Sequence, residues 1–99
     1  MDISNEKAVQ GLEVFAQNFH NDRVQELKDI KSFYQAENLQ KIKAIAHKWK
    51  GYSAPYGFNT LEKLSIELEN ETIKENKLKV GELIEQIENY LNLKRKYLH

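Results

Sequence analysis

His47 is the residue of this 99-residue chain best suited to nucleophilic chemistry, because the chain has no cysteine to supply a thiolate. It lies in the stretch AIAHKWKGYSAPYGF (residues 44–58), with Lys43, Lys48 and Lys50 close to it in sequence. An unperturbed pKa of about 6.5 leaves much of an imidazole neutral and nucleophilic at pH 7. Ammonium groups beside the ring would favour a phosphoryl group or another anion. The stretch therefore indicates either a histidine that handles an anion or a lysine-rich solvated face with an incidental histidine.

Helical periodicity places His47 away from the core. At about 100° per residue, it lies roughly 160° from the centre of the apolar arc of its own helix. That arc consists of Leu39, Ile42, Ile45, Ala46, Trp49, Tyr52 and Ser53. The neighbours of His47 on the helix surface are Lys43, Ala44, Lys50 and Gly51, with Ala54 one turn further. Because Ala44 and Gly51 are small, we expect the ring to be open to close approach by another protein.

The composition predicts one helical domain over residues 1–99. Lys and Arg number 15, and so do Asp and Glu, and this balance argues against general nucleic-acid binding. No apolar stretch approaches the roughly 18 residues of a membrane helix, and no secretory signal is visible. We therefore expect a cytoplasmic protein with no membrane association. The lack of cysteine excludes disulfides and Cys-type metal sites.

Apolar stripes with helical spacing predict the helices before and around His47. A stripe over residues 9–19 predicts an additional N-terminal helix, and a break or kink is expected at residues 20–22. A second stripe follows at residues 24–34. The histidine helix is expected at about residues 38–54, because Pro55 disfavours helical geometry in the residue before it.

Capping residues predict where the other helices begin. Asn38 is a good N-cap for the histidine helix, and Asn59 with Glu62 forms a capping-box pattern for the next one. A turn is expected near Asn76, and a last apolar stripe covers residues 80–91. With short loops between them, these helices predict an all-α, antiparallel four-helix bundle with an additional N-terminal helix. We expect a monomer, because one bundle can bury all the stripes.

The stretch AHKWKGYSAPYGFNTLEKLSIELE (residues 46–69) resembles the signature of histidine-containing phosphotransfer (HPt) domains. In that family the helix reads Ala-His-x-x-Lys-Gly, a glycine follows ten residues after the histidine, and a Leu-rich helix ends in Leu-Glu or Leu-Gln. The corresponding residues here are Ala46, His47, Lys50, Gly51, Gly57, Leu61, Leu64, Leu68 and Glu69.

Two positions depart from the family pattern. Trp49 stands where Leu, Ile or Met is usual, and Tyr52 stands where a small residue is usual. Tyr52 lies at the edge of the apolar arc, so we expect it to pack against the bundle rather than cover His47.

The resemblance implies that His47 accepts a phosphoryl group from an aspartyl phosphate of a response-regulator receiver domain and passes it to another receiver. Lys50 would screen the phosphoryl charge, and Lys43 and Lys48 would assist or steer an acidic partner. Glu69 occupies a family position whose side chain can reach the histidine and fix its tautomer. Alternatively, Glu69 is an ordinary solvated glutamate with no role at the histidine. Such a chain is a phosphocarrier rather than a true enzyme and needs no cofactor or metal of its own.

Two other functions stay open at this point. The chain could be a substrate domain that an ATP-dependent histidine kinase phosphorylates directly, which a glutamate at position 69 favours. It could also be a non-catalytic module that binds a receiver, although the intact set His47, Lys50 and Gly51 argues against this. His20 and His99 are interpreted as incidental, and neither has metal-ligand spacing with His47.

Overall fold

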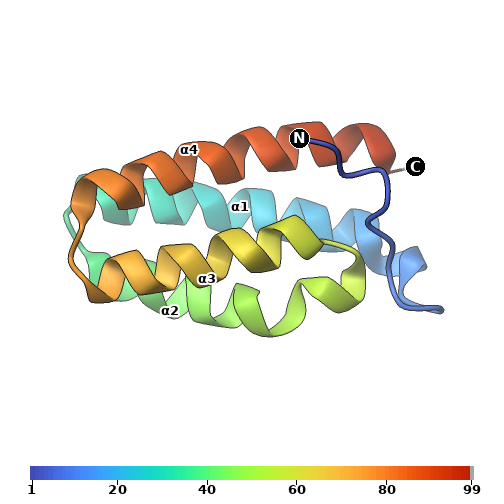
Figure 1. Cartoon of the computed structure of the whole chain (residues 1–99), viewed down its shortest axis with the longest axis horizontal. Helices are drawn as coiled ribbons and strands as arrows, with labels where there is room; N and C mark the ends of the chain where they lie inside the picture. The colour runs from blue at the N-terminus through green and yellow to red at the C-terminus, as the bar shows by residue number, and fades with distance from the viewer. Residues whose placement is uncertain (99) are drawn as a thin grey trace.

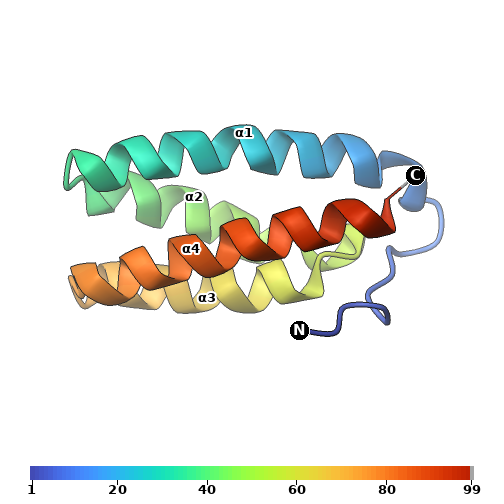
Figure 2. The same cartoon turned by 90° about the horizontal axis from the view of Figure 1, so that it is seen from above.

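Four amphipathic helices lie antiparallel around one core in the computed structural model, which describes residues 1–98 (Figures 1 and 2). Helix α1 packs on α2 and α4, and α3 packs on the same two helices. No strand occurs among the described residues, so the predicted all-α class and four-helix bundle are confirmed. The helices are α1 (Ala16–Gln35), α2 (Leu39–Tyr52), α3 (Asn59–Ile73) and α4 (Lys77–Lys94), with short 3-10 turns η1 (Glu13–Phe15), η2 (Ala54–Tyr56) and η3 (Arg95–Tyr97).

The core between the helices is filled by large apolar side chains, among which Trp49, Phe58 and Tyr90 are fully buried. The Trp49 indole also carries a polar group, and its Nε1 donates a hydrogen bond to Glu26 Oε1 at 2.8 Å. Arg23 Nε lies 2.6 Å from the same oxygen. A tryptophan is therefore accommodated at this position because α1 supplies a carboxylate for its N–H, which would otherwise be buried without a partner.

Asparagine caps begin two of the helices: the cap at Asn38 was predicted, and Asn76, where only a turn was expected, is the second. Asn38 Oδ1 accepts from the backbone N–H of Lys41 at 3.3 Å, and Asn76 Oδ1 accepts from that of Lys79 at 3.3 Å. Each bond satisfies a backbone donor that has no partner within its helix. These caps fix the turns that precede α2 and α4.

The prediction of an additional N-terminal helix was wrong: before α1, the described residues form only the single helical turn η1. Gly11 interrupts the segment with a left-handed φ of +95°, a conformation that helical residues do not adopt. The predicted break at residues 20–22 is also absent, because α1 runs through it. His20 is buried there, and its Nε2 donates to the carbonyl oxygen of Leu91 at 2.7 Å. His20 is thus a structural residue of the α1–α4 contact, whereas His99 lies outside the described residues.

The cap of α3 also differs from the prediction. Asn59 is already the first residue of the helix, and Phe58 at the N-cap position has no capping side chain. The carboxylate of Glu6 takes this role, since its Oε2 accepts from the backbone N–H of Thr60 at 2.9 Å. The sequence pattern of Asn59 and Glu62 failed because a segment far away in the chain supplies the acceptor.

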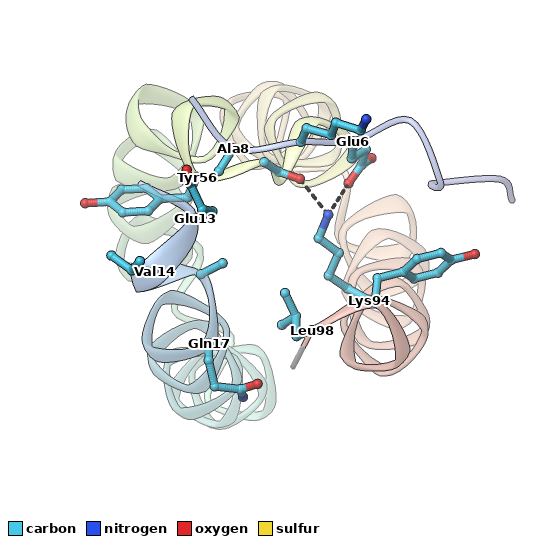
Figure 3. A pocket seen from close by; sticks show the side chains of 12 residues that line it. Glu6, Ala8, Glu13, Val14, Gln17, Tyr56, Lys94 and Leu98 are labelled. Carbon is cyan, nitrogen blue, oxygen red and sulfur yellow. Dashed lines mark hydrogen bonds and ion pairs between the residues drawn. The ribbon is translucent and has the colours of Figure 1, made fainter. Parts of the chain in front are cut away.

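Glu6 anchors the N-terminal segment across the end of the bundle where α2 is connected to α3 (Figure 1). Its Oε1 accepts from Tyr90 Oη at 2.6 Å and lies 3.1 Å from Lys94 Nζ. The Lys94 ammonium also donates to the carbonyl oxygen of Gly57 at 2.6 Å, beside a cavity of about 490 Å³ (Figure 3). Gly57 has a φ of +87°, and an added Cβ would lie 2.6 Å from the backbone nitrogen of Ala8. Glycine is therefore required where this segment crosses the connection.

No helix within residues 1–98 combines the length and the apolar character needed to cross a bilayer.

Candidate functional site

His47 projects from the solvent-facing side of α2, where its side chain is 67% exposed. The opposite side of the same helix carries the buried residues Ile42, Ala46 and Trp49. This placement agrees with the position that helical periodicity predicts for the ring. It leaves the imidazole accessible to a partner while α2 itself is held in the core.

Glu69 on α3 contacts the ring. Its Oε2 lies 2.8 Å from His47 Nδ1, and its side chain is only 11% exposed. A carboxylate oxygen accepts hydrogen bonds, so a neutral ring carries its proton on Nδ1 in this arrangement. The ring nitrogen with the free lone pair is then Nε2.

Lys50, one turn after His47, contacts the other oxygen of the same carboxylate. Lys50 Nζ lies 2.7 Å from Glu69 Oε1. The hydrogen bond from Lys50 holds the pKa of Glu69 below its ordinary value, and His47 adds to this effect against the opposing effect of burial. Glu69 is therefore ionised at neutral pH, and it is shared between a lysine and the histidine.

A groove of about 520 Å³ surrounds His47 on this face of the bundle. The residues that line it are Gln40, Lys43, Ala44, His47, Lys48 and Glu69. Gln40 is the one lining residue that the sequence analysis did not single out. It lies seven residues, or about two helical turns, before His47, so the same periodicity could have identified it.

The remaining predicted binding residues lie beyond the groove. Gly51 is exposed, and an added Cβ would meet no atom within 4 Å. Ala54 follows the end of α2 in the turn η2 and is half-buried. The open side of the helix beside His47 is thus formed by Ala44 and Gly51 rather than by Ala54.

Tyr52 packs against the bundle and does not cover His47, as predicted. Its ring meets Phe19 edge-on with centroids 5.6 Å apart, and the Arg23 guanidinium lies 4.8 Å from its centroid. Tyr56 stacks on the same Phe19 at 4.5 Å, and Phe58 is fully buried. These aromatic residues join α1 to the end of α2.

The fold and the site together define a class of protein: a four-helix bundle that displays one histidine on the outer face of its second helix. Residues 11–96 match the family model of the Hpt domain, and the chain belongs to this family. Hpt domains take part in histidine phosphotransfer in two-component systems, where they interact with receiver domains and kinases. Comparisons with curated proteins and with solved structures find no match.

Proposed function

We propose that this protein is an intermediate of a two-component phosphorelay and that His47 is its phosphoacceptor. In this proposal His47 receives a phosphoryl group from the aspartyl phosphate of one receiver domain and passes it to the aspartate of another. The observation that carries the proposal is the 2.8 Å contact between His47 Nδ1 and Glu69 Oε2 on an otherwise exposed ring. A histidine that is incidental on a solvated face needs no such partner.

The chemistry follows from this contact. The lone pair of Nε2 attacks phosphorus, the P–N bond forms, and the P–O bond to the aspartate breaks, so that the aspartate leaves as a carboxylate. The ring keeps its Nδ1 proton and becomes positively charged, and the ionised Glu69 stabilises that charge. Return of the phosphoryl group to a second aspartate reverses these changes. Alignment and charge stabilisation account for most of such a transfer, so we propose no cofactor and no metal for this chain.

The neighbouring residues have supporting roles in this proposal. Lys50 holds Glu69 in place through Oε1, and Ala44 and Gly51 leave room for a receiver domain to approach the ring. Lys43 and Lys48 attract an acidic partner surface. We further propose that residues 1–99 act as a single HPt-like domain, monomeric and cytoplasmic.

Direct phosphorylation by an ATP-dependent histidine kinase is a second candidate function. It is favoured by the carboxylate at position 69, because an ionised partner raises the nucleophilicity of the ring more than a neutral amide would. In this case the phosphoryl group would come from ATP on the kinase, and His47 would still be the acceptor.

The test uses phosphorylated receiver domains and, separately, a histidine kinase with ATP, each carrying labelled phosphorus. Acid-labile label is expected on the wild-type chain and is expected to be absent from His47→Gln. Lys41→Gln, a substitution at an exposed position of the same helix, is the matched control and should be labelled like the wild type. Label that persists in His47→Gln would contradict the proposal. So would a wild-type chain that none of the tested receivers and kinases labels.

A further inference from the structure

The lysines of α2 differ in what they contact. Lys50 is bound to Glu69 at 2.7 Å. Lys43 and Lys48 line the groove around His47, and neither forms an ion pair with any carboxylate of residues 1–98. Lys50, in contrast, is not among the residues that line the groove.

The whole chain is neutral, yet α2 is strongly basic. It contains Lys41, Lys43, Lys48 and Lys50 and no aspartate or glutamate. Glu69 is the only acidic residue lining the groove, and Lys50 already offsets its charge. The groove around His47 therefore has a net positive character that comes from Lys43 and Lys48.

A phosphoryl group on Nε2 would bring additional negative charge into this groove. Lys50 is already bound to Glu69, a side chain that is 11% exposed and would lose its closest cation if Lys50 moved to the phosphoryl group. Lys43 and Lys48 have no ion pair to break. Lys43 also lies one helical turn before His47, on the same face of α2.

We infer that Lys43 and Lys48, rather than Lys50, hold the phosphoryl group once it is bound to Nε2 of His47. The inference rests on the proposed function, since it concerns the phosphorylated state of the same histidine. Gln40 lines the same groove, and in this inference its side-chain amide is a further donor for the phosphoryl oxygens. Lys50 is then a positioning residue that acts through Glu69.

Ammonium groups beside a phosphoryl group favour its dianion, so they lower the pKa of its last ionisation. The test loads His47 with phosphoramidate, a small donor that needs no receiver domain. In that reaction the P–N bond of phosphoramidate breaks, the P–Nε2 bond forms, and ammonia leaves. The pKa of the bound phosphoryl group is then measured from the pH dependence of its ³¹P chemical shift.

Lys43→Gln and Lys48→Gln are each expected to raise this pKa by about 0.3 units at about 0.1 M salt, and the double variant by about 0.6. At about 1 M salt, where the Debye length is about 3 Å, these differences should largely disappear. Lys41→Gln is the matched control, because Lys41 lies 5.3 Å from the Phe33 ring and does not line the groove. Its phosphoryl pKa should equal that of the wild type.

The double variant Lys50→Gln/Glu69→Gln removes the other ion pair without changing the net charge. It should be phosphorylated more slowly but should show the wild-type phosphoryl pKa. An unchanged pKa in Lys43→Gln and Lys48→Gln would overturn the inference and leave the proposed function standing. Failure of the wild-type chain to form any phosphohistidine would overturn both.

Discussion

One carboxylate, that of Glu69, contacts His47 Nδ1 at 2.8 Å with Oε2 and Lys50 Nζ at 2.7 Å with Oε1. The histidine and the lysine lie one turn apart on α2, and the glutamate lies 22 residues after His47 on α3. Packing of α3 against α2 brings the three together. The carboxylate thereby orients the ring and is itself held in place by the lysine.

Replacing Glu69 by Gln should slow phosphorylation of His47 by about tenfold or more, since a hydrogen bond to a charged group contributes about 1.5–3 kcal/mol. The rate is measured with phosphoramidate, and ¹⁵N shifts of the ring report whether Nδ1 still carries the proton. Glu67→Gln is the control, because Glu67 is exposed on the same helix. Equal rates for Glu69→Gln and the wild type would show that the contact has no part in the chemistry.

Substitutions at Gly51 should distinguish the docking of a receiver domain from the chemistry at His47. Because an added Cβ meets no atom within 4 Å, Gly51→Ala should fold normally and stabilise α2 by about 1 kcal/mol. The larger, uncharged Gly51→Gln should reduce transfer from a phospho-receiver by about tenfold through steric conflict with the partner. Its reaction with phosphoramidate should be unchanged. If both variants accept from the receiver at the wild-type rate, no partner approaches this side of the helix.

Glu6→Gln should destabilise the fold, because Lys94 is only 4% exposed and would lose the carboxylate that offsets its charge. The expected loss is about 3 kcal/mol in the free energy of unfolding, measured by urea denaturation. Glu13→Gln in the same N-terminal segment is the matched control, since Glu13 is exposed. A similar small loss in both variants would mean that the buried pair contributes little.

Stability should depend on pH through Glu6 and Glu69. Burial of Glu6 raises its pKa, but hydrogen bonds from Thr60, Tyr90 and Lys94 together bring the pKa below its ordinary value of 4.5. The pKa of Glu69 is also lowered. A carboxyl group whose pKa is lower in the folded state stabilises the fold above pH 4.5, and this contribution is lost as pH falls through the folded-state pKa. The unfolding free energy should therefore decrease below about pH 4.5.

The control for this prediction is Glu6→Gln, which removes one of the two groups. Its unfolding free energy should fall less steeply with acid than that of the wild type. Identical slopes for the two proteins would exclude Glu6 as a source of the pH dependence.

Two of the mistaken sequence predictions share a physical cause. Local patterns placed a helix break at residues 20–22 and a cap at Asn59. The first was overturned by a contact between His20 and Leu91, and the second by a contact between Glu6 and Thr60, partners that are 71 and 54 residues apart. Capping and turn preferences are differences of about 1 kcal/mol, so a single buried hydrogen bond from elsewhere in the chain can outweigh them.

By itself, the sequence determined the helical class, the cap at Asn38, the turn near Asn76 and the outward direction of His47. These features depend on a period of 3.6 residues and on neighbours within one or two turns, and both can be read along the chain. The tertiary structure decided which atoms meet: that Glu69 reaches Nδ1, that Lys50 is bound to Glu69, and that Lys43 and Lys48 face the groove without a partner among the described residues. Those relations depend on how α3 packs against α2 and on which rotamers the packing allows, and no local pattern encodes them.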